Sequence, residues 1–152
     1  MLSVDELVDR LIDLSFAEDI GDGDHTTLCC IPDDAMGKSH LLIKEDGILA
    51  GVEIAKEVFH RFDPTMQVEV LMQDGTRVKK GDIAMIVSGK IRSLLQTERL
   101  MLNIMQRMSG IATMTDKYVQ HLKGTKTRVL DTRKTTPGMR MLEKQAVKIG
   151  GL

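Results

Sequence analysis

The feature that most constrains the fold is a strongly apolar segment in the middle of the chain, LLQTERLMLNIMQRM at residues 94–108. Met101, Met105 and Met108 lie at spacings of four and three residues, which is the repeat of one face of an α-helix. A helix with such a face must bury it. We therefore expect these methionines to pack in a core or a subunit interface rather than to take part in chemistry.

The expected ends of this helix come from the neighbouring residues. Ser93 and Gln96 have the spacing of a capping box, which predicts the start of the helix. Ser109-Gly110 predicts an interruption, after which a shorter helix is expected to end near Gly124. The sequence therefore predicts two helical pieces rather than one.

The residues before this helix combine helical and strand patterns. Ser3 and Glu6 form a capping box for a first helix, and residues 18–27 contain enough Gly and Asp to predict a loop. Further patterns predict two strands within 38–50, a helix from Val52 that ends at Asp63-Pro64, a strand at 66–70 and a strand at 83–87. Residues 1–90 are thus expected to form an α+β fold.

The composition is that of a globular protein, with 42% hydrophobic and 28% charged residues. No apolar run approaches the roughly 18 residues of a membrane span, and the amino terminus lacks the features of a signal peptide. The adjacent Cys29 and Cys30 cannot easily form a disulfide with each other and have no partners at metal-ligand spacing. We therefore expect a cytoplasmic protein with no membrane partner.

Charge divides the chain into two halves. Residues 1–75 hold 17 acidic and 5 basic side chains, whereas residues 76–152 hold 5 acidic and 16 basic ones. A basic half suits nucleic acid or a small polyanion, but only 3% of the residues are aromatic, which leaves few platforms for stacking bases. The pattern therefore favours a small molecule that carries phosphates or carboxylates, and not nucleic acid.

The last part of the chain has the pattern of one βα unit. Residues 127–131 predict a strand, 132–137 a loop and 138–149 a helix, on whose apolar face Gln145 is the one polar member. In a barrel of such units, the loops that follow the strands build the active site. This loop is therefore the first place to expect chemistry.

The loop carries two adjacent cations, Arg133 and Lys134, in front of a helix start. Arginine offers a planar fork that matches a carboxylate or phosphate, lysine adds a point charge, and free N–H groups at the helix start favour the same anion. A solvated basic turn is the alternative interpretation. The residues by themselves leave both interpretations open.

Arg99 is the second candidate because it lies within the apolar helix, beside Glu98. Taken alone, this position is better explained by a salt bridge or by a side chain that extends to solvent along the apolar surface. The four histidines share no ligand spacing and are given no role: they are His25, His40, His60 and His121.

Six segments of the chain, in this order and spacing, resemble the quinolinate phosphoribosyltransferases. They are EDIGDGDHTT at 18–27, GILAG at 47–51, ERLMLN at 98–103, SGIAT at 109–113, DTRKTTPGMR at 131–140 and LEKQAVKIGG at 142–151. The resemblance implies an α+β amino-terminal sandwich domain with the long apolar helix at 1–106. It also implies that 107–152 hold the first βα unit of an α/β (TIM-like) barrel, truncated in this chain.

The same resemblance implies a site and a reaction. Arg99 matches an arginine that is contributed across the interface of a homodimer or higher homo-oligomer with a shared active site. Thr132, Arg133 and Lys134 match residues that hold the carboxylates of quinolinate or the phosphates of phosphoribosyl pyrophosphate. The implied products are nicotinate mononucleotide, pyrophosphate and CO2, on the route to NAD, with help from Mg²⁺ whose ligands are expected outside this chain.

The family pattern continues with an AsnHisArg motif, a further lysine and acidic residues, whereas this sequence ends at Leu152. A full barrel has about 250 residues, so one βα unit cannot close. The alternative function is therefore a non-catalytic dimerisation or binding fragment. A carrier domain is a second alternative, because residues 74–89 locally resemble the hairpins of biotinyl and lipoyl domains, although they lack the MetLysMet turn.

Overall fold

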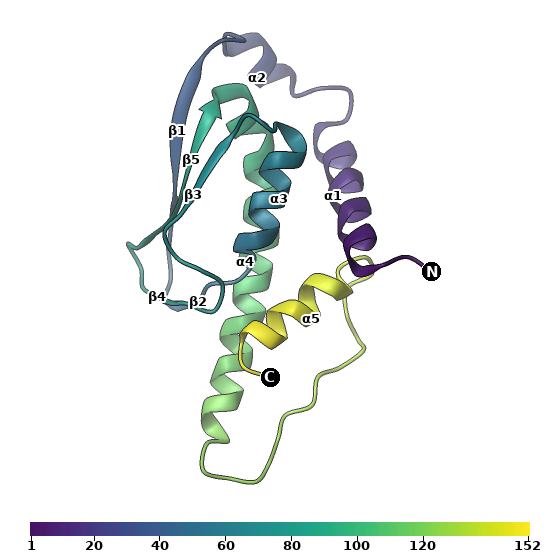
Figure 1. Ribbon diagram of the computed structural model, residues 1–152, viewed down its shortest axis with the longest axis vertical. Coiled ribbons are helices and arrows are strands. Elements are labelled where there is room, and N and C mark those ends of the chain that lie inside the picture. Colours follow the sequence, from purple (N-terminus) through teal and green to yellow (C-terminus); the bar gives the residue numbers. More distant parts are fainter.

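The computed structural model describes all residues 1–152 and shows a mixed helix and sheet fold arranged around one long helix (Figure 1). In chain order the elements are α1 (Val4–Ile20), α2 (His25–Cys30), β1 (Met36–Leu42), β2 (Gly47–Ile48), α3 (Val52–Phe62), β3 (Gln67–Val70), β4 (Arg77–Val78), β5 (Ile83–Lys90), α4 (Ile91–His121) and α5 (Arg140–Ile149).

The strands form two small antiparallel sheets. The larger has the order β1-β5-β3, and β2 pairs with β4 in the smaller one. The central strand β5 buries Ala84, Met85 and Val87, while α3 and α4 lie together on one side of the sheet (Figure 1). The predicted α+β fold of residues 1–90 is thus confirmed, including the helix that ends at Asp63-Pro64.

The methionine stripe of α4 lies in the core, as its spacing predicts. Met101, Met105 and Met108 expose 7% or less of their surface and pack against buried residues of α3 and β5. No helix of the structure, α4 included, combines the length and the apolar character needed to cross a membrane.

The first helix begins as expected but extends further. Ser3 Oγ accepts a hydrogen bond from the Glu6 backbone N–H, and the Glu6 carboxylate accepts one from the Ser3 N–H, so the capping box is confirmed. The loop predicted at 18–27 is shorter than expected, because α1 continues to Ile20 and α2 begins at His25. A helix can begin within this Asp-rich stretch because Asp24 caps α2.

The capping box predicted at Ser93 and Gln96 is wrong. Helix α4 already begins at Ile91, and Ser93 Oγ instead donates a hydrogen bond of 2.6 Å to Asp63 Oδ2, 30 residues earlier in the chain. Gln96 Nε2 donates to the Arg92 carbonyl within the helix. The Ser93 hydroxyl therefore bonds to a residue distant in sequence instead of capping its own helix.

The predicted interruption of the long helix at Ser109-Gly110 is also wrong, because α4 runs unbroken to His121. Ser109 Oγ accepts a hydrogen bond from the Ala50 N–H and donates one to its carbonyl, and Thr113 Oγ1 accepts from the Ile48 N–H. A Cβ added to Gly47 would lie 2.5 Å from Thr113 Oγ1, so only glycine fits there. The segments 47–51 and 109–113 therefore pack on each other.

The strand predicted at 127–131 does not form. These residues have no regular structure, and the side chain of Leu130 is largely exposed. A strand is stabilised by hydrogen bonds to a neighbouring strand, and none of the strands of this structure pairs with the segment. Of the predicted strand, loop and helix, only the loop and the helix are present, so the first βα unit of a barrel is not confirmed, and no closed barrel is present.

Helix α5 packs across α4, as Figure 1 shows. Leu142 and Ala146 are fully buried, and a Cβ on Gly150 would lie 2.5 Å from the Ala112 carbonyl oxygen. The buried polar residue of this helix is Glu143 rather than Gln145, which is only partly buried. The buried face of the helix is therefore rotated slightly from the predicted one.

The continuity of α4 can be tested at Gly110. An added Cβ meets no atom within 4 Å there, so Gly110→Ala should raise the free energy of unfolding by about 1 kcal/mol, as expected for a glycine inside a helix. Gly150→Ala should lower it by about 1–3 kcal/mol through overpacking against α4. Urea denaturation measures both, and a destabilised Gly110→Ala chain would contradict the continuous helix.

Candidate functional site

The predicted site residues Thr132, Arg133 and Lys134 lie in the irregular segment that leads into α5. All three are exposed. The side chains of Arg133 and Lys134 make no hydrogen bond or ion pair, so both cations are free to meet a ligand. By contrast, the backbone of this segment is firmly held.

Two basic residues of α5 hold that backbone. Lys144 Nζ donates to the Thr132 carbonyl and forms an ion pair with Asp131. Arg140 donates from Nη2 to the Arg133 carbonyl at 3.1 Å, and also donates from Nε to Thr135 Oγ1 at 3.0 Å. These two cations of α5 are therefore occupied with the loop, while Arg133 and Lys134 of the loop remain available.

A buried carboxylate connects the same loop to α4. The Glu143 side chain is 9% exposed and accepts hydrogen bonds from Arg107 Nε at 2.7 Å and from the Thr136 N–H at 3.2 Å. Arg107 Nη2 also donates to Thr136 Oγ1 at 2.7 Å. Burial alone would raise the pKa of Glu143, but the hydrogen bonds from Arg107 and Thr136 outweigh it and lower that pKa.

These supporting residues were missed at the sequence level. Arg107 and Glu143 are separated by 36 residues and contact each other only because α5 crosses α4. Glu143 and Lys144 do belong to the segment 142–151 that carries the family resemblance, so the resemblance could have marked them. Their contacts could not have been found without the tertiary structure.

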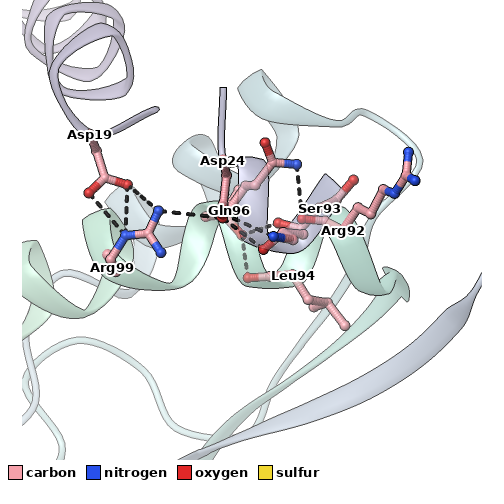
Figure 2. A network of polar contacts seen from close by, with 9 residues as sticks. Asp19, Asp24, Arg92, Ser93, Leu94, Gln96 and Arg99 are labelled. Carbon is pink, nitrogen blue, oxygen red and sulfur yellow. Dashed lines mark hydrogen bonds and ion pairs between the residues drawn. The ribbon is translucent and has the colours of Figure 1, made fainter. Parts of the chain in front are cut away.

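Arg99 lies on α4 and is half exposed, with 49% of its side chain accessible. Its Nε donates to both carboxylate oxygens of Asp19 at 3.0 Å, and its Nη2 lies 3.0 Å from Asp19 Oδ2 and 3.7 Å from Asp24 Oδ2 (Figure 2). The hydrogen bonds to Asp19 raise the pKa of Arg99. The salt bridge that the sequence offered as an alternative is thus present.

Arg99 and the loop with residues 132–134 lie along one side of α4, but the structure does not join them. Arg99, Asn103 and Arg107 recur every four residues and share one helix face, so the outer two lie about 12 Å apart along the axis. A hollow of about 250 Å³ runs along this face, with Asp19 and Met139 also among its lining residues. No hydrogen bond or ion pair connects Arg99 to residues 132–134 of the same chain.

A larger hollow of about 600 Å³ lies between α1 and the same loop. Arg10 of α1 and Arg140 of α5 both line it, together with Thr135 and Thr136. The surface beside the loop is therefore positively charged on more than one element. This arrangement suits a small anion better than a neutral or cationic ligand.

The residues present do not fit a protein-bound metal ion. No three His, Cys, Asp or Glu side chains of the structure come together closely enough to hold one.

Comparison with known proteins finds two family models that match consecutive parts of the chain. The family model for the quinolinate phosphoribosyl transferase N-terminal domain matches residues 24–109, and the model for the C-terminal domain of the same family matches residues 111–152. The first of these matches includes 74–89, the segment with a local similarity to carrier domains.

The chain is similar in sequence to a quinolinate phosphoribosyltransferase (decarboxylating) of Nicotiana tabacum, with 44% identity over 93% of this chain and 40% of the relative. It is 41% identical to a probable nicotinate-nucleotide pyrophosphorylase (carboxylating) of Synechocystis, over 95% of this chain and 49% of the relative. The crystal structure of NadC from Streptococcus pyogenes matches with a TM-score of 0.93 and 37% identity, over 99% of this chain and 53% of that chain.

The relatives are named as phosphoribosyltransferases and pyrophosphorylases, which are names given to pentosyltransferases. The chain belongs to the quinolinate phosphoribosyltransferase family. It spans about half the length of the relatives that it matches.

The link between Glu143 and Arg107 predicts a pH-dependent contribution to stability. A carboxylate with a lowered folded pKa stabilises fully above its ordinary value of 4.5, and this contribution is lost as the pH falls through the folded pKa. Glu143→Gln should cost about 2 kcal/mol at pH 7 and progressively less below pH 4.5.

Thermal unfolding across this pH range measures the difference between wild type and variant. Glu98→Gln is the matched control, because Glu98 is exposed and makes no hydrogen bond through its side chain. A difference for Glu143→Gln that stays constant with pH would show that its charge does not stabilise the loop.

Proposed function

We propose that this chain carries part of the active site of an enzyme that transfers a phosphoribosyl group from phosphoribosyl pyrophosphate to quinolinate. The products are nicotinate mononucleotide, pyrophosphate and CO2, a step in the biosynthesis of NAD. The observation that carries this proposal is the loop at 131–138. Its Arg133 and Lys134 side chains are unpaired, while neighbouring cations anchor its backbone.

The substrates are anions, and the loop offers them complementary charge. Quinolinate carries two carboxylates, and the guanidinium of Arg133 can donate two parallel hydrogen bonds to one of them. Lys134 adds a compact charge that suits a phosphate or the second carboxylate. Thr132 contributes a hydroxyl beside them. We assign these three residues to substrate binding, because each is exposed and close to the others in sequence.

The chemistry needs positioning and charge more than covalent help from the protein. The pyridine nitrogen forms a bond to C1 of the sugar while the bond from C1 to pyrophosphate breaks, and the electron pair leaves with pyrophosphate. The carboxylate next to the ring nitrogen then leaves as CO2, and the ring carbon takes up a proton. Fixed cations favour these steps by orienting the dicarboxylate and by stabilising the leaving group.

Two further assignments belong to this proposal. Mg²⁺ is expected to accompany the pyrophosphate group of the substrate, since this cation is commonly bound through substrate phosphates. A cytoplasmic location is supported by the two free thiols of Cys29 and Cys30, which suit a reducing compartment.

We further propose a homodimer in which Arg99 of one subunit faces the loop of the other. Within one chain, Arg99 is bonded to Asp19 of α1 and lies near Asp24, the N-cap of α2, and it forms no hydrogen bond or ion pair with the loop. Several apolar side chains are also exposed, among them Leu130, Tyr118 and Met114, which a subunit contact would cover. A shared site would bring a third cation to the same anion.

The first test is the binding of quinolinate, measured by isothermal titration calorimetry. Arg133→Ala should weaken binding about tenfold or more, because a lost charge-assisted hydrogen bond costs about 1.5 kcal/mol or more. Lys126→Ala removes one charge from an exposed position on the same connection and should leave the affinity unchanged. Equal affinities of wild type and Arg133→Ala would contradict the proposed site.

Turnover is assayed separately, by following nicotinate mononucleotide formed from quinolinate and phosphoribosyl pyrophosphate with Mg²⁺. Product that disappears in Arg133→Ala and persists in Lys126→Ala supports the transferase. Quinolinate binding without product indicates the alternative, a dimerisation or binding fragment of the enzyme.

The shared site makes a prediction about mixed subunits. Arg99→Ala and Arg133→Ala should each abolish tight quinolinate binding, but an equimolar mixture that exchanges subunits should recover about a quarter of the sites. This follows because half of the dimers are mixed and each of these has one intact site in a two-fold arrangement. If both residues served the same site within one chain, every site in the mixture would remain defective.

A further inference from the structure

The guanidinium of Arg99 is held along one edge only. Nε and Nη2 form its bonds to Asp19, and Nη2 also lies near Asp24, whereas Nη1 donates to no group in the structure. Figure 2 shows both carboxylates approaching the guanidinium. Because half of the side chain is accessible, the unpaired Nη1 can reach a ligand from solvent.

Both carboxylates come from fixed points of the backbone. Asp19 lies in the last turn of α1, and its side chain is 28% exposed. Asp24 is the N-cap of α2, accepts hydrogen bonds from Thr27 N–H at 3.2 Å and Thr27 Oγ1 at 2.8 Å, and has a side chain only 12% exposed. The Thr27 bonds lower the pKa of Asp24 and keep it charged.

The turn between the two helices explains how both acids reach one arginine. Gly21 and Gly23 have positive φ values of 56° and 139°, a backbone conformation that other residues adopt at a cost. The chain can therefore turn within the four residues that separate α1 from α2. This gives a structural role to the segment 18–27, which the proposed function leaves without one.

We propose that Asp19 and Asp24 are positioning residues that fix the guanidinium of Arg99, with its Nη1 edge open, for contact with the anionic substrate. This inference rests on the proposed function, in which Arg99 meets quinolinate. A free arginine side chain loses rotamer freedom on binding, and a side chain that is already fixed avoids that loss. The acids therefore prepare the arginine for its ligand.

The opposite relation is physically possible and must be separated from this one. Two carboxylates beside Arg99 also compete with an anionic ligand for its charge. If they act as competitors, their removal tightens substrate binding. If they act as positioning residues, their removal weakens it, so the sign of the change decides between the two.

The variants are Asp19→Ala, which removes the acceptor, and Asp19→Asn, which keeps an acceptor of the same shape without the charge. Asp13→Ala is the matched control. Asp13 lies on the same helix and holds Arg61 through two hydrogen bonds of 2.7 and 2.8 Å, in the same edge-on manner. Both Ala variants thus remove one arginine–carboxylate pair from α1.

Two quantities are measured on the full chain. One is the affinity for quinolinate by isothermal titration calorimetry. The other is the NMR resonance of the Arg99 Nε–H group, identified by its absence in Arg99→Lys. This resonance reports the orientation of the side chain and would not move through a general loss of stability.

We expect Asp19→Ala to weaken quinolinate binding about tenfold, which corresponds to about 1.4 kcal/mol, and to shift the Arg99 resonance to the position of a free arginine. Asp19→Asn should fall between Asp19→Ala and wild type, and Asp13→Ala should match wild type in both measurements. Unchanged or tighter binding by Asp19→Ala overturns the inference. So does a wild-type resonance in that variant.

Failure of the proposed function gives a different pattern. A wild-type chain that does not bind quinolinate, or an Arg99→Lys chain that binds it as well as wild type, contradicts the role of Arg99 in substrate binding. The resonance of Arg99 in Asp19→Ala still reports, independently of binding, whether Asp19 holds the side chain.

Discussion

The unbroken helix α4 is the constraint on which the other elements depend. Its methionine face is the centre of the core, so the sheet and α3 are stable only where they cover it. Its polar side chains hold the remaining elements, since Arg99 binds the ends of α1 and α2, Arg107 binds α5, and Ser109 binds the chain beside β2. One helix therefore fixes both the core and the position of each candidate site residue.

The charges of the candidate site are divided between support and binding. Three cations support the loop and set its shape. They donate hydrogen bonds to the loop or to Glu143, which anchors it, and are Arg107, Arg140 and Lys144. The hydrogen bonds from α5 go to backbone carbonyls of the loop, so the side chains of Arg133 and Lys134 have no partner. A rigid backbone with free cations is an arrangement prepared for an anion, since little ordering remains to be done when the ligand arrives.

Local patterns predicted most of the elements correctly, because caps, turns and hydrophobic repeats act within a few residues. Helix α3, both strands of residues 38–50 and the first capping box were found in this way. The errors occurred where the local structure depends on residues that are distant in sequence. Ser93 bonds to Asp63 instead of capping its own helix, and residues 127–131 have no neighbouring strand to pair with.

The sequence by itself determined the class of fold in residues 1–90, the buried methionine face, the loop with Arg133 and Lys134, and the family to which the chain belongs. These follow from residue types and short spacings, which a linear chain displays directly. The tertiary structure alone decided that Arg99 is held by Asp19 and Asp24, and that Glu143 joins the loop to α4. The contacts of Arg107 with Glu143 and of Arg99 with Asp19 join residues 36 and 80 positions apart, and only packing of the whole chain brings them within hydrogen-bonding distance.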